Sequence, residues 1–88
     1  MAVYIVAYDL NKETRRPPIV AEVQRDPWAR LSESSYAIST SETVQQVYER
    51  FKAYLDDNDT LFVITLNKPW QSWASDELNK WMNTYLSY

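Results

Sequence analysis

An aspartate and two arginines stand close together near the start of the chain, in the stretch VAYDLNKETRR. Asp9 follows an apolar segment, and Arg15 and Arg16 come six and seven residues later. A carboxylate at the end of a strand can bind Mg²⁺ or Mn²⁺ through one or two oxygens, while water completes the coordination. Guanidinium groups form paired, charge-assisted hydrogen bonds with phosphate oxygens. The spacing therefore indicates a metal ligand at Asp9 beside phosphate contacts at Arg15 and Arg16.

One carboxylate alone makes a weak metal site, so a second acid is needed. Glu13 or Glu33 could supply it, and so could Asp9 of a second copy across a two-fold axis. In the alternative interpretation, Asp9 forms an Asx-turn and the arginines are solvated charges, an arrangement common in turns. The spacing leaves both interpretations open.

The composition removes several classes of chemistry. The 88 residues include no cysteine, histidine or glycine, which excludes disulfides, thiolate and imidazole metal ligands, Ser-His-Asp triads and glycine-rich phosphate loops. The net charge of -3 argues against bulk electrostatic coating of nucleic acid, so any such contact would be local. With no signal-peptide pattern and no membrane-spanning run, we expect a cytoplasmic protein without membrane contact.

The apolar pattern predicts a strand, a short helix, a hairpin, a long helix, a second strand and a last helix. The two strands outside the hairpin are apolar on both faces, which is typical of central strands. The stripe on the long helix predicts core packing. The expected elements are a strand over Ala2–Tyr8, a helix from Pro18 ending before Pro27, a hairpin of Trp28–Leu31 and Ser35–Ser39, a helix over Val44–Leu55, a strand over Thr60–Leu66 and a helix over Ala74–Tyr85.

This order predicts an α+β fold, a ferredoxin-like split βαβ sandwich in which two helices pack on an antiparallel sheet, with an extra C-terminal helix. The length predicts one domain over residues 1–88, with a core over about 2–66 and a Trp-rich helical extension over about 70–88. Trp70, Trp73 and Trp81 in that extension favour core packing or a protein interface. Base stacking is the alternative, but it would call for an accompanying basic groove.

Several of these features resemble the CRISPR-associated Cas2-like family and its stand-alone relatives, including the virulence-associated protein D group. The first strand ends in Tyr8-Asp9-Leu10, the arginine pair follows, and Ser34-Ser35-Tyr36 precedes a helix and an apolar last strand. The resemblance covers about residues 2–66, and its specific element is the Tyr-Asp pair.

The resemblance implies a ferredoxin-like homodimer whose protomers pack their sheets together. In some members the aspartate that ends the first strand is associated with metal-dependent phosphodiester cleavage, and others are non-catalytic scaffolds that bind DNA in an integration complex. By position, Asp9 would be the catalytic metal ligand, Arg15 and Arg16 would contact phosphate, and Ser35 and Tyr36 would lie near the nucleic-acid site.

We therefore expect a Cas2-like protein that, if it is an enzyme, is an Mg²⁺- or Mn²⁺-dependent nuclease acting on RNA or DNA through Asp9. The alternative is a non-catalytic interaction module on the same fold, such as a phage or plasmid inhibitor or a toxin-antitoxin component. That module would bind a protein through its sheet or its Trp-rich C-terminus. The negative net charge and the single well-placed acid per chain support this alternative.

Overall fold

A computed structural model describes residues 1–86. Its sheet contains the strands β1 (Ala2–Asp9), β2 (Trp28–Ser32), β3 (Ser35–Thr40) and β4 (Thr60–Leu66), in the order β2-β3-β1-β4 with all neighbours antiparallel. The helices are α1 (Arg16–Val23), α2 (Val44–Lys52) and α3 (Asp76–Tyr85), and a 3-10 turn over Glu13–Arg15 leads into α1. This confirms the predicted α+β, ferredoxin-like fold. The predicted C-terminal extension includes residues 87 and 88, which lie outside the described residues.

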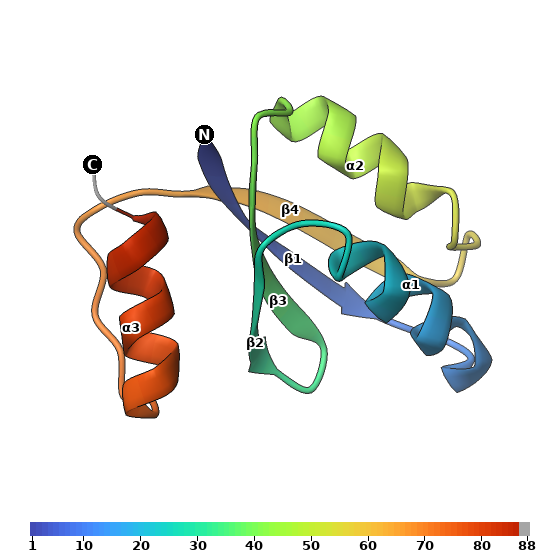
Figure 1. Ribbon diagram of the computed structural model, residues 1–88. Coiled ribbons are helices and arrows are strands. Elements are labelled where there is room, and N and C mark those ends of the chain that lie inside the picture. The colour runs from blue at the N-terminus through green and yellow to red at the C-terminus, as the bar shows by residue number, and fades with distance from the viewer. Residues whose placement is uncertain (87–88) are drawn as a thin grey trace.

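One face of the sheet is closed by α1 and α2 (Figure 1). Tyr4, Val6 and Tyr8 of β1 point to this face and are almost fully buried. They pack with Ile19 of α1 and Phe51 of α2, both at most 1% exposed. Because side chains alternate along a strand, every second residue of β1 joins this core. We call this side the helix-covered face.

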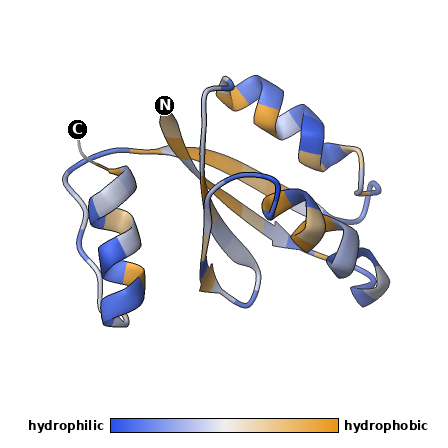
Figure 2. Cartoon of the chain, in the orientation of Figure 1, coloured by the Kyte–Doolittle hydropathy of each residue, from blue (hydrophilic) through white to orange (hydrophobic). Residues whose placement is uncertain are grey.

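The opposite face, here called the open face, is covered only in part. α3 lies beside β2, away from the other two helices (Figure 1), and its Met82 packs against Val3 and Ala37. Beyond α3, Phe62 and Ile64 of β4 remain 59% and 50% exposed. Hydrophobic residues thus run along β4, and among residues 1–86 no helix covers Phe62 and Ile64, whereas α2 alternates hydrophilic and hydrophobic residues (Figure 2) and buries Val47 and Phe51.

Two expectations about the elements are wrong. β4 is an edge strand rather than a central one, and Phe62 and Ile64 of its second apolar row are exposed because no helix among residues 1–86 covers them. The first helix begins at Arg16, two residues before Pro18, since proline is tolerated throughout the first helical turn, where no backbone donor is required. Among residues 1–86, no helix combines the length and apolar character that crossing a bilayer requires.

Candidate metal and phosphate site

Asp9 is the last residue of β1 and lies opposite Thr60 of β4. Its side chain is exposed on the open face, on the same side as Ala7 and Phe62. Within residues 1–86 the Asp9 carboxylate takes part in no hydrogen bond or ion pair, so it does not form the turn bond of the alternative interpretation. A carboxylate that no protein group occupies is available to an incoming cation.

A second acid at the same margin of the sheet is in the opposite situation. Asp59 directly precedes β4, and its side chain is inaccessible to solvent. The Asp59 carboxylate accepts a bond from Arg15 Nε at 2.8 Å and from the backbone N–H groups of Asn11 and Asp56 at 2.7 and 3.0 Å. The Arg15 bond, helped by these two amides, lowers the pKa of Asp59 to about 2. Sequence reasoning missed this residue, although the run Asp56-Asp57-Asn58-Asp59 marks a carboxylate-rich turn.

Arg15 is therefore engaged inside the protein. Besides Asp59, it donates from Nη2 to Asp56 at 2.6 Å, and its side chain is only 21% exposed. These bonds fix the 3-10 turn against the start of β4. The predicted phosphate contact of Arg15 stays a prediction, and it would require Arg15 to exchange one of these partners.

Arg16 joins the end of β1 to the turn between β2 and β3. Its Nε donates to Glu13 at 2.7 Å, its Nη1 to the carbonyl of Glu33 at 2.6 Å, and its Nη2 to Ser34 Oγ at 3.3 Å. The hydrogen bond to Glu13 raises the pKa of Arg16 further above its ordinary value, so this guanidinium stays charged. The guanidinium also lies 5.4 Å from the ring centroid of Tyr8. Arg16 follows Asp9 by seven residues in the sequence. Its role in phosphate binding remains a prediction.

The structure separates the two residues of the second-strand motif. Ser35 lies opposite Ala7, on the same face as Asp9, and its hydroxyl is 2.6 Å from that of Ser32. Tyr36 faces the helix-covered side, is 5% exposed and packs 5.9 Å from the ring of Trp28. This burial favours a packing role for Tyr36, whereas Ser35 lies on the open face and its predicted role stays a prediction.

Few side chains near Asp9 could act as ligands of a divalent metal ion. Glu13, one of the suggested second acids, is bonded to Arg16, and no group of three or more metal-ligating side chains forms within the described chain. The exposed Asp9 carboxylate is nevertheless the hard oxygen ligand that Mg²⁺ and Mn²⁺ prefer. The residues fit such an ion if water and a second copy of the chain complete the coordination.

A second polar cluster, between α1 and α2, was also missed by sequence reasoning. Arg50 donates to Glu22 and Asp26, each at 2.9 Å, and to Glu42. Tyr54 donates to Glu22 at 2.8 Å. Burial alone would raise the pKa of Glu22, but the bonds from Tyr54 and Arg50 lower it overall. All these groups satisfy one another, so the cluster is built to join helices rather than to hold a ligand.

Comparison with known proteins agrees with this architecture. No protein-family model matches the chain. A crystal structure of a hypothetical protein from Thermus thermophilus has the same fold, with a TM-score of 0.69 and 20% identity over 84% of this chain and 92% of that one. The fold therefore defines a small ferredoxin-like protein.

Sequence similarity identifies the family. The CRISPR-associated endoribonuclease Cas2 of Thermofilum pendens is 36% identical over 67 residues, which make up 75% of this chain and 72% of that protein. The chain belongs to the CRISPR-associated Cas2 family. This confirms the family resemblance read from the Tyr8-Asp9-Leu10 and Ser34-Ser35-Tyr36 motifs.

Proposed function

We propose that the protein is a metal-dependent endoribonuclease that works as a homodimer, with Asp9 as the metal ligand of each protomer. The observation that carries this proposal is the exposed Asp9 carboxylate, which no other group of residues 1–86 engages, at the margin of the open face. The relative from Thermofilum pendens is named an endoribonuclease, which supports RNA as the substrate. The proposal treats residues 1–88 as one domain acting in the cytoplasm.

The open face supports the dimer. Phe62 and Ile64 expose apolar side chains there, next to Ile5 and Ala7 of the neighbouring strand. Contiguous exposed apolar residues favour association, because covering them removes apolar area from water. A two-fold axis through this face would set identical residues opposite one another. Two Asp9 carboxylates could then share one site, which a single chain does not complete.

The chain would contribute ligands and positioning groups to the reaction. Asp9 would hold Mg²⁺ or Mn²⁺, and when bound this ion lowers the pKa of a water molecule and neutralises charge on the phosphodiester. The hydroxyls of Thr60 and Ser35 lie on the same face and can donate hydrogen bonds to phosphate oxygens. Arg16 stays charged at the neighbouring turn and can attract the RNA backbone.

The test is cleavage of end-labelled RNA and DNA with and without Mg²⁺ or Mn²⁺. We expect metal-dependent cleavage of RNA that Asp9→Asn abolishes while the thermal unfolding curve stays unchanged. Asp57→Asn is the matched control, because Asp57 is an exposed acid in the turn before β4, and this variant should cleave normally. Full activity in the Asp9→Asn variant would contradict the proposal.

A second candidate is a non-catalytic interaction module, and the state of the arginines favours it. Arg15 and Arg16 both bond to carboxylates of their own chain, which leaves less free positive charge for nucleic acid. This candidate predicts no cleavage under any metal condition. It also predicts that an Arg15→Ala variant binds RNA and DNA no more weakly than the unmodified protein does. The cleavage assay thus separates the two functions.

A further inference from the structure

The outer edge of β2 is unpaired within residues 1–86. β2 stands at the end of the sheet and pairs only with β3. The N–H of Ser39 donates to the carbonyl of Pro27 at 3.0 Å, and the pairing register then sets Ala29 opposite Ala37. Because hydrogen-bonded and non-bonded pairs alternate in an antiparallel ladder, the N–H and C=O groups of Trp28 and Arg30 point away from β3. No backbone or side-chain group of the described chain bonds to them.

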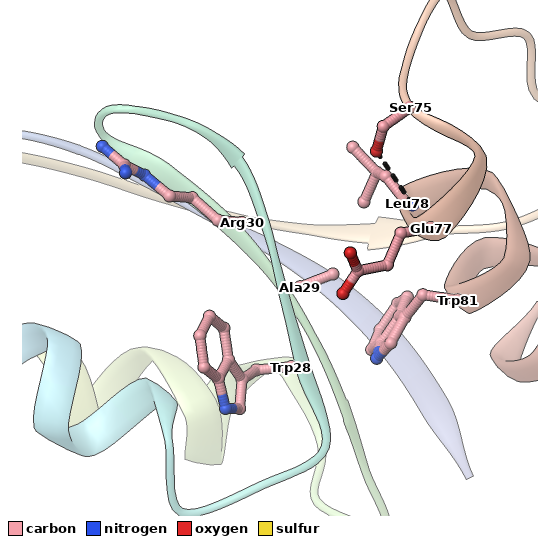
Figure 3. A pocket seen from close by; sticks show the side chains of 7 residues that line it. All are labelled: Trp28, Ala29, Arg30, Ser75, Glu77, Leu78 and Trp81. Atoms are coloured by element: carbon pink, nitrogen blue, oxygen red, sulfur yellow. Dashed lines mark hydrogen bonds between the residues drawn. The ribbon is translucent and has the colours of Figure 1, made fainter.

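A groove runs along this edge, between β2 and the first turns of α3. Its volume is about 380 Å³, and it is lined by Trp28, Ala29, Arg30, Ser75, Glu77, Leu78 and Trp81. Figure 3 shows Trp28 and Arg30 on one side of the strand, with Ala29, Glu77 and Trp81 on the other. The groove therefore presents both the backbone edge of β2 and side chains from both faces of the sheet.

The groove carries one acidic side chain, Glu77, beside the strand β2. The carboxylate of Glu77 makes no ion pair or hydrogen bond with residues 1–86, and the side chain points toward Ala29 (Figure 3). The one cation of the lining, Arg30, turns away and donates to the carbonyl of Ser32 at 3.2 Å. Trp81 is held by Tyr85, whose ring centroid is 4.6 Å away. An incoming basic side chain would thus find an unpaired carboxylate beside an indole face.

We propose that this groove binds an extended, basic segment of a partner protein, which adds a fifth strand beside β2. Binding in this way uses backbone hydrogen bonds for affinity and alternate side chains for selection. The partner residue opposite Ala29 shares its face, so an arginine there reaches Glu77 and Trp81. Its two neighbours fall on the side of Trp28. The inference does not depend on the nuclease proposal, because Asp9 contributes nothing to the groove.

The test uses the peptide acetyl-Thr-Val-Arg-Val-Thr-amide, which reads the same in both directions and so fits either strand orientation. We expect amide hydrogen exchange at Trp28 and Arg30 to slow when the peptide is added, whereas Ala29, already paired with β3, stays unchanged. N-methylation of the peptide at alternate positions should separate the two registers. Methyl groups on one set should abolish binding, while those on the other set should leave it intact.

Protein variants test the selection of a basic residue. Glu77→Gln should weaken peptide binding about two- to fivefold, in keeping with a partly exposed ion pair, and replacing the peptide arginine with citrulline should have the same effect. Asp76→Asn is the matched control, since it removes the same charge from the same helical turn but lies outside the groove. It should leave the affinity unchanged.

A proline at the edge tests strand addition directly. Arg30→Pro removes an outward-pointing N–H, which an edge strand tolerates, and should abolish binding, while Arg30→Ala should retain it. If Arg30→Pro does not fold, the methylated peptides give the same information. Protection of β4 amides instead of Trp28 and Arg30, equal tolerance of both methylation patterns, or equal binding of the arginine and citrulline peptides would overturn the proposal.

Discussion

The two faces of the sheet carry the same kinds of residue in opposite states. On the helix-covered face, apolar side chains are buried by α1 and α2, and the acids around Arg50 are paired. On the open face, Phe62 and Ile64 remain exposed and Asp9 is unpaired within residues 1–86. Buried and satisfied groups stabilise the fold, whereas exposed and unsatisfied groups are free to bind. The contrast assigns stability to the covered parts of the sheet, including the patch under α3, and binding to the uncovered part of the open face around Phe62, Ile64 and Asp9.

The largest expected difference between the faces lies in their aromatic residues. Phe51 is fully buried, so Phe51→Ala should lower the free energy of unfolding by about 3–5 kcal/mol. Urea denaturation followed by circular dichroism measures this. A loss below about 1 kcal/mol would show that the helix-covered face is not the packed core of the protein.

Removal of the shared cation of the helix-covered face should have the next largest effect. Arg50→Ala leaves Glu22, Asp26 and Glu42 without their common donor, and we expect a loss of about 1–3 kcal/mol in the free energy of unfolding. Arg25 also contacts Glu22, but its side chain is 70% exposed. Arg25→Ala should therefore cost less than about 1 kcal/mol. Equal losses in the two variants would contradict the special role of Arg50.

Asp59 should contribute stability that depends on pH. Its folded-state pKa is about 2, below that of an unfolded aspartate, so its contribution is full above about pH 4 and is lost as pH falls toward 2. Asp59→Asn should lower the melting temperature at pH 7 by several degrees and have almost no effect near pH 2. Asp9→Asn is the control from the open face and should leave the melting temperature unchanged at pH 7. A pH-independent effect of Asp59→Asn would contradict the Arg15 pairing.

The smallest effect on folding is expected for Phe62, where self-association should change instead. Phe62→Lys removes exposed apolar area, so the free energy of unfolding of the monomer should change by only about 0.5 kcal/mol. Dimerisation should weaken at least about tenfold, which corresponds to about 1.4 kcal/mol. Sedimentation equilibrium measures both species, and an unchanged dimer would place the interface elsewhere.

The sequence predicted the fold better than the site. Alternation in Ala2–Tyr8 and the helical stripe from Val44 identified elements of the core, because burial imposes these periods on the chain. The same pattern led to the wrong expectation that β4 is a central strand. An exposed row of apolar residues on a strand has the same sequence pattern as a buried row. Asp9 was singled out by its place after a strand. The partners of Arg15 escaped notice because Asp59 lies 44 residues away in sequence.

Titration of the protein with Mn²⁺, followed by electron paramagnetic resonance and calorimetry, tests directly whether Asp9 holds a metal ion. We expect one bound Mn²⁺ for every two chains, lost in Asp9→Asn and retained in Asp59→Asn under conditions where that variant stays folded. Mn²⁺ binding that survives Asp9→Asn would contradict the assignment of Asp9, at the margin of the open face, as the metal ligand.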